Sequence, residues 1–353
     1  MNRFLIASLL LITLAGCAQQ NKQDQWIEQV ASEIQAGYGE LNTQAVKLVE
    51  TAQHHCAATV QAQEQSLAQV KAQWQATMLA WQRIQWVRFG PIATNNDDWK
   101  LQFWPDKKNL VARKVQEILN QKQPITQKHI AKASVVIQGL SALEYLIYEP
   151  AFQHSHCELL VAVAENVNVV SASLKTQWQS DGPFVTQWIQ LSQTERAANL
   201  PNQAVGEVFD GLLAQMERIK LDKLGGPLGL KNRTKKPNGY FAESWRSGTS
   251  LNNIKANVAA FRLIVEGQGV GLVALLKHNH QSDLAHQLLQ QVIQIQDTLA
   301  TINVPLNKAV LDENNRKQVE ALHNEFGALN SLLKNKVAPA LDVSLGFNAN
   351  DGD

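Results

Sequence analysis

Hydrophobic residues recur along this chain at intervals of three and four positions, which is the period of an amphipathic α-helix. Two such sets are Trp26, Val30, Ile34 and Tyr38, and Leu67, Val70, Trp74, Met78 and Trp81. Glutamine and alanine fill many positions between them, as is typical of long helices with a polar face. Alternating strand patterns are nearly absent, so the pattern predicts an all-α fold.

Proline, glycine and short polar runs divide this pattern into successive helices. Pro105, Pro124 and Pro150 each interrupt a helical segment, and Asp106 is placed as a helix start signal. The predicted helices span residues 106–120, 126–149, 155–179, 202–224, 250–266, 269–277, 282–302 and 312–337. Residues 183–192 and 194–201 predict only short pieces.

The longest loop that we expect, residues 225–240, is rich in glycine, proline and lysine. A structureless loop of this length is uncommon in a compact domain and usually has a function. The helices before and after it suggest two helical-bundle halves, each resembling a four-helix bundle, packed together. We assign residues 26–183 to the first half, 184–345 to the second, and 346–353 to an irregular tail.

The first residues predict export. Arg3 precedes an apolar run from Phe4 to Leu14, which is too short to span a bilayer and fits a signal peptide over residues 1–16. The run ends in Leu-Ala-Gly-Cys and resembles the lipobox of bacterial lipoproteins, which implies lipidation of Cys17. Ala18 follows Cys17 where an aspartate would favour inner-membrane retention. We therefore expect a lipid-anchored protein at the outer membrane, facing the periplasm, with residues 17–25 as a polar tether. The alternative is an ordinary signal peptide with a chance cysteine.

Composition and charge exclude one class of partner. The chain has 32 basic and 31 acidic residues, and 45% of its residues are hydrophobic. Proteins that bind nucleic acid need a basic patch, so we expect no nucleic-acid partner. The hydrophobic content is sufficient for a packed core.

Two cysteines remain in the mature chain, Cys56 and Cys157, and an oxidising compartment favours a disulfide between them. The alternative is a pair of buried free thiols. Histidines adjoin both cysteines, and the disulfide would bring four imidazoles together as a candidate surface metal site. These are His54, His55, His154 and His156. The competing and preferred interpretation is that they are solvated side chains at helix ends.

The sequence Gly-Leu-Ser-Ala-Leu-Glu-Tyr-Leu contains the most specific candidate site. Ser141 and Glu144 are three residues apart and share one helix face. A histidine at position 141 would form a His-x-x-Glu pair that can hold a metal ion. Gly139, which we place in mid-helix, indicates close approach of another backbone or of a ligand. Alternatively, Glu144 is a buried acid with an internal partner.

This stretch resembles the Gly-x-His-x-x-Glu signature of the imelysin family. Residues 81–91, 103–108, 223–229, 243–261 and 345–353 resemble further family blocks in the same order. The resemblance implies an all-helical fold of two bundle-like halves, export, and a site where the halves meet. It also implies either a metallopeptidase, for which the family was named, or a role in iron uptake. Gly139 and Glu144 match the motif, whereas Ser141 replaces the histidine, and a hydroxyl is a poor ligand for zinc or iron.

We expect four more residues to line the cleft between the halves. They are Glu243, Ser244, Arg246 and Ser247, for which helix capping and a local salt bridge are the alternative roles. The sequence has neither His-Glu-x-x-His nor a Gly-x-Ser-x-Gly elbow, so its motifs do not favour catalysis.

The leading hypothesis is a binding role in the acquisition of iron or another divalent metal, with the cleft near Glu144 as the site. The partners that we expect are the membrane, through the lipid at Cys17, and iron-uptake or redox proteins. The alternatives are a metallopeptidase and a non-catalytic partner-binding module whose metal site is degenerate.

Overall fold

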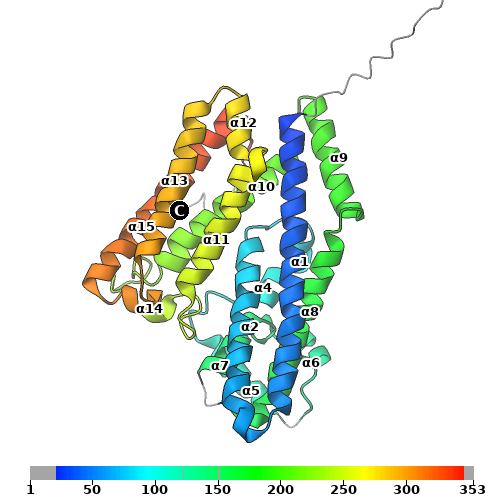
Figure 1. The fold of residues 1–353 in the computed structure, drawn as a ribbon, viewed down its shortest axis with the longest axis vertical. Helices are drawn as coiled ribbons and strands as arrows, with labels where there is room; N and C mark the ends of the chain where they lie inside the picture. The colour runs from blue at the N-terminus through cyan, green and yellow to red at the C-terminus, as the bar shows by residue number, and fades with distance from the viewer. Residues whose placement is uncertain (1–20, 122, 150–151, 346–353) are drawn as a thin grey trace, which may run out of the picture.

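The computed structural model describes residues 21–121, 123–149 and 152–345, so the predicted signal peptide, Cys17 and the tail lie outside the described residues. Helices, turns and irregular segments make up these ranges, with no strand among them. The all-α prediction is therefore confirmed. Figure 1 shows the long helices gathered in two groups that lean against each other.

The first group is built on α1 (Lys22–Ala57), which packs along α2 (Gln63–Ile84) and α8 (Cys157–Gln177). This group also contains five shorter helices, namely α3 (Pro91–Thr94), α4 (Asp97–Leu101), α5 (Leu110–Leu119), α6 (Gln127–Lys132) and α7 (Leu140–Tyr148). Single turns connect them at η1 (Val60–Ala62), η2 (Val135–Ile137) and η3 (His154–His156). Helix α9 (Pro183–Ala197) packs on both α1 and α10.

The second group is built on α10 (Gln203–Glu217), α11 (Ser250–Glu266), α13 (Ser282–Thr301) and α15 (Glu313–Leu332). Its smaller helices are α12 (Leu272–His278), α14 (Leu306–Ala309) and α16 (Ala338–Ala340). Its single turns are η5 (Gly239–Phe241) and η6 (Gly267–Gly269). Two segments have π-helical geometry, η4 (Arg218–Leu224) directly after α10 and η7 (Leu333–Val337) directly after α15.

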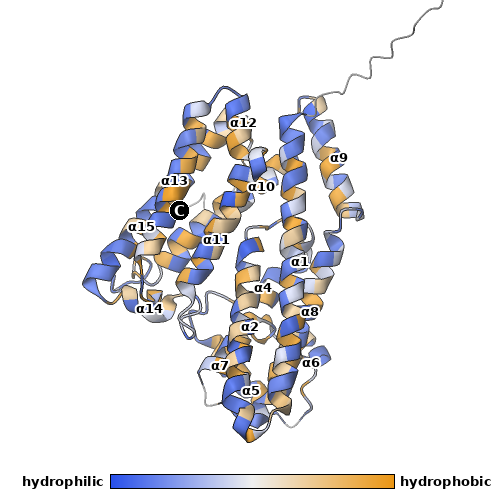
Figure 2. Ribbon diagram, viewed as in Figure 1, coloured by the Kyte–Doolittle hydropathy of each residue, from blue (hydrophilic) through white to orange (hydrophobic). Residues whose placement is uncertain are grey.

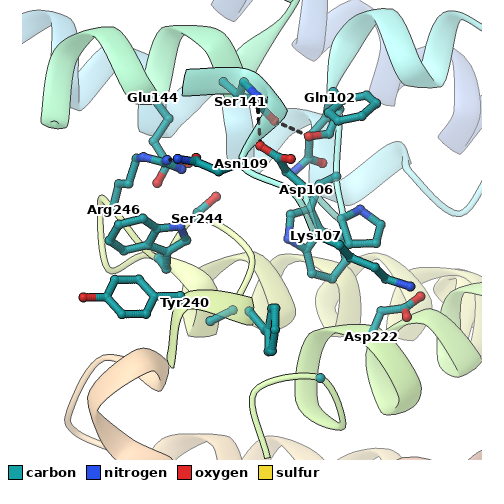
Figure 3. Close-up of a pocket in the computed structure, with 18 of the residues that line it drawn as sticks. Gln102, Asp106, Lys107, Asn109, Ser141, Glu144, Asp222, Tyr240, Ser244 and Arg246 are labelled. Carbon is teal, nitrogen blue, oxygen red and sulfur yellow. Dashed lines mark hydrogen bonds between the residues drawn. The ribbon is translucent and has the colours of Figure 1, made fainter. Parts of the chain in front are cut away.

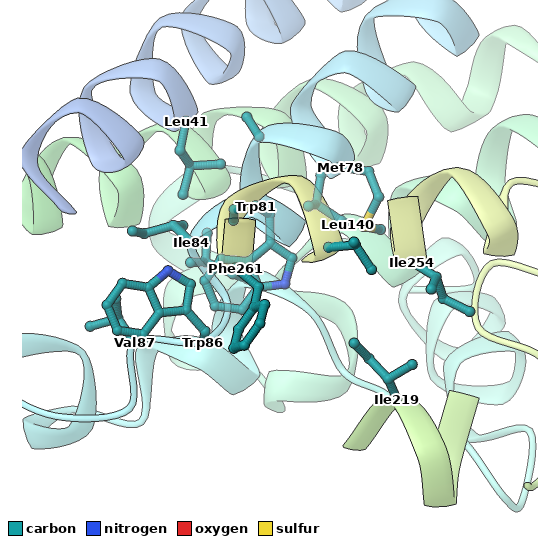
Figure 4. Packing of buried hydrophobic residues seen from close by; sticks show 14 of the residues in the cluster. Leu41, Met78, Trp81, Ile84, Trp86, Val87, Leu140, Ile219, Ile254 and Phe261 are labelled. Atoms are coloured by element: carbon teal, nitrogen blue, oxygen red, sulfur yellow. The ribbon is translucent and has the colours of Figure 1, made fainter. Parts of the chain in front are cut away.

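One continuous hydrophobic core connects the two groups. Helix α2 packs against α11 across the junction, and Figure 4 shows Met78 and Trp81 of α2 near Ile254 and Phe261 of α11. Figure 2 shows hydrophilic and hydrophobic bands along α1 and α13, as expected for helices that present one face to the core. The junction is thus packed like an interior, which holds the residues on its two sides in fixed positions.

The prediction of one helix over residues 126–149 is wrong. The segment contains α6, η2 and α7, and Gly139 is the extended residue before α7 rather than a mid-helix residue. A Cβ atom at Gly139 would lie 2.3 Å from the carbonyl oxygens of Lys100 and Leu101. The close approach of another backbone, which this glycine indicated, is therefore confirmed. The approach occurs at the break before α7 and not in the middle of one long helix.

Further boundaries differ from the predictions. Helix α1 begins at Lys22, inside the predicted polar tether of residues 17–25. Residues 183–197 form one helix, α9, rather than short pieces, because Val185, Trp188 and Ser192 on one face are buried. Helix α5 begins at Leu110 rather than at Asp106, whose carboxylate accepts hydrogen bonds from the backbone N–H groups of Leu110 and Val111 at 2.7 and 2.9 Å. Asp106 thus caps the helix from four residues ahead.

Candidate functional site

A cavity of about 520 Å³ lies where the two groups of helices meet. Residues 102–111 and α7 form one wall, and residues 222–246 form the other. Figure 3 shows Ser141 and Glu144 on one side of this cavity and Ser244, Arg246 and Tyr240 on the other. The predicted long loop thus contributes directly to the cavity, as its length suggested.

Ser141 and Glu144 project from α7 into this region, but their side chains have separate partners. The Ser141 hydroxyl donates a hydrogen bond to the Phe103 carbonyl oxygen at 3.0 Å. One carboxylate oxygen of Glu144 accepts hydrogen bonds from the backbone N–H and the hydroxyl of Ser247, at 2.9 and 2.8 Å. Ser141 is therefore anchored to its own half, while Glu144 joins the two halves.

The electrostatic environment of Glu144 is unusual for a carboxylate. The residue is buried, and this burial raises the pKa of its carboxyl group from 4.5 to about 7. The hydrogen bonds from Ser247 and the charge of Arg246 oppose the rise, while Glu243 adds to it. Near neutral pH, Glu144 therefore exchanges readily between its charged and neutral forms, a property common among functional carboxylates.

Arg246 connects the cavity wall to the end of α7. Its guanidinium forms an ion pair with Glu149 and donates a hydrogen bond to Asn109 at 2.9 Å. The guanidinium also lies 4.5 Å from the centre of the Trp245 ring and 5.3 Å from that of Tyr145. These contacts to aromatic faces and to a carboxylate are the ones that arginine makes best, and they hold Arg246 rigidly.

Glu243 lies beneath the cavity in a buried polar network. It forms an ion pair with Lys223 at 2.9 Å, and both side chains are 1% exposed. Its carboxylate oxygens also accept hydrogen bonds from Gln82, Gln102 and Asn253 at 3.0–3.2 Å. Burial lowers the pKa of Lys223 to about 8, against the attraction of Glu243. Glu243 is thus a structural anchor between the halves, although it lies next to residues that line the cavity.

Ser244 does line the cavity, and its backbone adopts φ +50°, a left-handed conformation uncommon for serine. Its hydroxyl accepts a hydrogen bond from Asn253 at 3.1 Å, and its carbonyl oxygen lies 3.0 Å from the Ser247 hydroxyl, where it competes with Glu144 for the single proton of that hydroxyl. These contacts stabilise the turn that brings Ser247 to Glu144. Residues 244–247 therefore also have the local structural role that was the alternative interpretation for them.

The structure joins Cys56 to Cys157 in a disulfide, with the two Cα atoms 5.6 Å apart. The neighbouring histidines differ in their surroundings. His55 is buried and bonded to the Ser66 hydroxyl at 2.8 Å, and His156 accepts a hydrogen bond from the Gln153 backbone N–H. His54 and His154 are exposed. Burial lowers the pKa of the His55 imidazole, and the neighbouring His154 and His54 lower it further. His54 and His154 thus lie near His55, but no group of three or more His, Cys, Asp or Glu side chains in the described ranges, these four histidines included, is arranged to hold a metal ion.

Glu144 does not belong to a preformed group of metal ligands. In the described ranges, no group of three or more His, Cys, Asp or Glu side chains is arranged to hold a metal ion. The carboxylates that line the cavity already have partners, since Asp106 caps α5, Glu149 pairs with Arg246 and Asp222 pairs with Lys231. The mechanism of a metallopeptidase, which needs several converging ligands, has no donor set here among the described residues.

Sequence reasoning missed much of the cavity wall. Aromatic side chains supply a large part of it, namely Phe103, Trp104, Tyr240, Phe241 and Trp245. Tyr240 is 70% exposed and packs edge-on against Trp245, with ring centres 4.7 Å apart. Phe103, Trp104 and Trp245 fall within segments that carried the family resemblance, whereas Tyr240 and Phe241 lie between two of those segments. Only the tertiary contacts reveal that all five share one cavity.

The fold and the site define an all-helical protein with a ligand-sized cavity between two helical groups. The chain belongs to the imelysin family, whose sequence profile matches residues 34–333. It is 24% identical over 286 residues to iron-regulated protein A of Synechococcus elongatus, covering 78% of this chain and 75% of that protein.

Two solved structures share the fold. An imelysin-like protein from Psychrobacter arcticum aligns with a TM-score of 0.79 at 21% identity, covering 92% of this chain and 97% of the other. A protein from Parabacteroides distasonis, described as an iron-regulated protein A precursor, aligns with a TM-score of 0.69 at 16% identity, covering 91% and 97%. The two solved structures thus share the fold of this chain, and two of the three relatives are themselves described as iron-regulated proteins.

Proposed function

We propose that this protein is an exported, lipid-anchored binding protein that acts in the acquisition of iron or another divalent metal. The cavity beside Glu144 is its binding site. The observation that carries this proposal is the position of the cavity at the packed junction of the two helical groups, where Glu144 of α7 meets Ser247 of the second group. Ligand sites commonly form at such junctions.

The metal is cargo in this proposal, not a resident cofactor. For Glu144 to contact a cation, its carboxylate must be charged and must exchange Ser247 for the ion. Because burial raises the pKa of Glu144 to about 7, protons compete with the cation below that pH. Metal binding at this residue therefore releases protons and weakens as the pH falls.

The test is metal analysis of the full chain purified from iron-replete cells, alongside Glu144→Ala and a matched control, Asp97→Asn. Asp97 is also buried, but it pairs with Lys100 and does not line the cavity. We expect metal in the wild type and in the control, and little in Glu144→Ala. Metal-free wild-type protein, or equal metal content in all three, contradicts the proposal.

A second candidate is a non-catalytic module that binds a partner protein of an iron-uptake or redox system through the same cavity. The aromatic wall favours it, because Tyr240 and Trp245 offer the kind of side chains that dominate binding interfaces. Crosslinking from a photoreactive residue at position 240 in intact cells distinguishes the two candidates. A specific protein crosslink together with metal-free protein supports the module, whereas metal without a crosslink supports the metal carrier.

The proposed location is the outer membrane, with the protein facing the periplasm and anchored by a lipid on Cys17. The Cys56–Cys157 disulfide supports export, because such bonds persist in oxidising compartments. A Cys17→Ser variant tests the anchor. We expect it to lose incorporation of labelled fatty acid and to leave the membrane fraction, and retention of the label in this variant contradicts the proposal.

A further inference from the structure

Aromatic side chains make up a large part of the wall of the cavity beside Glu144. They are Phe103, Trp104, Tyr240, Phe241 and Trp245. A divalent cation with six water ligands occupies roughly 180 Å³, at about 30 Å³ per water molecule. The cavity has a volume of about 520 Å³. It is therefore larger and more aromatic than a bare hydrated cation requires, and it has room for an organic molecule.

Tyr240 is exposed, yet its backbone is fixed. Its side chain is 70% exposed. Its backbone N–H donates a hydrogen bond to the Asn238 side chain at 3.0 Å. A Cβ atom at the buried neighbour Gly239 would collide with the carbonyl oxygen of Asn307, so this turn packs closely on α14. A ring on such a fixed turn loses little conformational freedom when a ligand packs against it.

Trp245 connects Tyr240 to the segment that binds Glu144. Its ring meets that of Tyr240 edge-on, with the ring centres 4.7 Å apart, and its centre lies 4.5 Å from the Arg246 guanidinium. Two residues further on, the Ser247 backbone N–H donates a hydrogen bond to the Glu144 carboxylate at 2.9 Å. Figure 3 shows Tyr240 and Glu144 on facing sides of the cavity. The two rings and the carboxylate thus line one cavity in fixed positions.

Glu144 can contribute a single carboxylate to a metal ion. Protein sites for zinc and similar ions usually provide three or four ligands. The other carboxylates of the wall have partners of their own, since Asp106 caps α5 and both Glu149 and Asp222 form ion pairs. In the part of the chain that the structure describes, no group of three or more ligand side chains is arranged to hold a metal ion. A metal bound at Glu144 must therefore bring most of its ligands with it.

We propose that the metal enters this cavity as a complex with an aromatic organic chelator that leaves one coordination position open. This ligand class depends on the proposed function, because it presupposes that the cavity is the metal site. The rings of the chelator pack against Tyr240 and Trp245, and the charged Glu144 carboxylate takes the open position. The bond between the metal and a water molecule breaks, the bond to Glu144 forms, and the chelator stays intact.

The experiment is calorimetric titration of the metal-free full chain with three forms of zinc, at a pH above the value of about 7 at which Glu144 titrates. The forms are a one-to-one complex with phenanthroline, a one-to-one complex with ethylenediamine, and zinc chloride. Both chelators bind through two nitrogen atoms, but only phenanthroline is aromatic, and zinc has no redox chemistry. We expect the phenanthroline complex to bind about tenfold more tightly than the other two forms.

The variants separate the contribution of the aromatic wall from that of the carboxylate. Tyr240→Ala should weaken binding of the phenanthroline complex about three- to tenfold and leave the other two forms unchanged. Glu144→Gln should weaken the binding of every form of zinc, because the amide is a poorer metal ligand than the carboxylate. The matched control is Leu200→Ala, an apolar side chain that is 59% exposed and does not line the cavity, and it should change nothing.

The outcomes that contradict this ligand class differ from those that contradict the proposed function. Equal affinity for all three forms of zinc, with binding still lost in Glu144→Gln, overturns the aromatic chelator and leaves a metal site at Glu144. An equal effect of Tyr240→Ala on all three forms overturns it as well, as does equally tight binding of phenanthroline without zinc. If no form of zinc depends on Glu144, the proposed metal site itself is wrong.

Discussion

Replacing Glu144 by glutamine tests the electrostatics of the cavity most directly. Glutamine keeps a carbonyl oxygen that can accept both hydrogen bonds from Ser247, but it cannot ionise. The substitution therefore removes the titration of this residue while preserving its shape and its contact across the junction.

The magnitude follows from the raised pKa. Burial moves the pKa of Glu144 from 4.5 to about 7. Between these two values the folded state binds the proton more tightly than the unfolded state, so protonation stabilises the fold. This contribution is complete below pH 4.5 and is lost as the pH rises through 7. At about 1.4 kcal/mol per pKa unit, the free energy of unfolding of the wild type falls by up to about 3 kcal/mol over this range.

The assay is denaturant unfolding, followed by tryptophan fluorescence at several pH values from about 5 to just below 8. Lys223, whose pKa burial lowers to about 8, also titrates near the upper end of this range, but it does so in both proteins, so the comparison of variant with wild type isolates Glu144. We expect Glu144→Gln to match the wild type near the acid end and to be more stable by up to about 3 kcal/mol near the other end. Glu50→Gln, at an exposed position of α1, is the control and should differ little from the wild type at any pH.

A difference between Glu144→Gln and the wild type that does not change with pH would refute the raised pKa. A variant less stable than the wild type near pH 8 would refute it as well, because it would show that the charged carboxylate is the favoured partner of Ser247.

Three other sets of substitutions test the rest of the structure by the same unfolding measurement. Lys223→Met should lower the free energy of unfolding by about 3–5 kcal/mol, because it leaves the charge of Glu243 buried and uncompensated. Adding Glu243→Gln should recover part of this loss, and the absence of any recovery would contradict the ion pair. Gly139→Ala should destabilise the fold by roughly 2 kcal/mol or more, because the new methyl group meets two carbonyl oxygens. Gly39→Ala should stabilise the fold by about 1 kcal/mol, because Gly39 lies in α1 with open space around it. Equal effects of the two substitutions would contradict the close approach at Gly139. Replacing Cys56 and Cys157 by alanine should cost about 4–5 kcal/mol, since the disulfide closes a loop with a sequence separation of 101. Two alkylatable thiols in the unreduced wild type would contradict the bond.

The candidate site could be predicted only in part. Ser141, Glu144, Ser244 and Arg246 do line the cavity, whereas Gly139 is not among its lining residues and packs against the backbone at the end of α4. Glu243 and Lys223 could not be paired from the sequence, because nothing in two separate polar residues shows that both are buried in one network.

The sequence by itself determined the helices, because helical periodicity depends on neighbours three and four positions apart. It also determined the family, through motifs that are each short and local. Only the tertiary structure decided which residue Glu144 contacts, since Ser247 lies 103 residues away along the chain. It also decided that the predicted helix over residues 126–149 is broken at Gly139. Both outcomes depend on the packing of distant segments, namely α7 against the turn before α11 and Gly139 against the end of α4. Such contacts are set by shape and burial across the whole chain, and no local pattern encodes them.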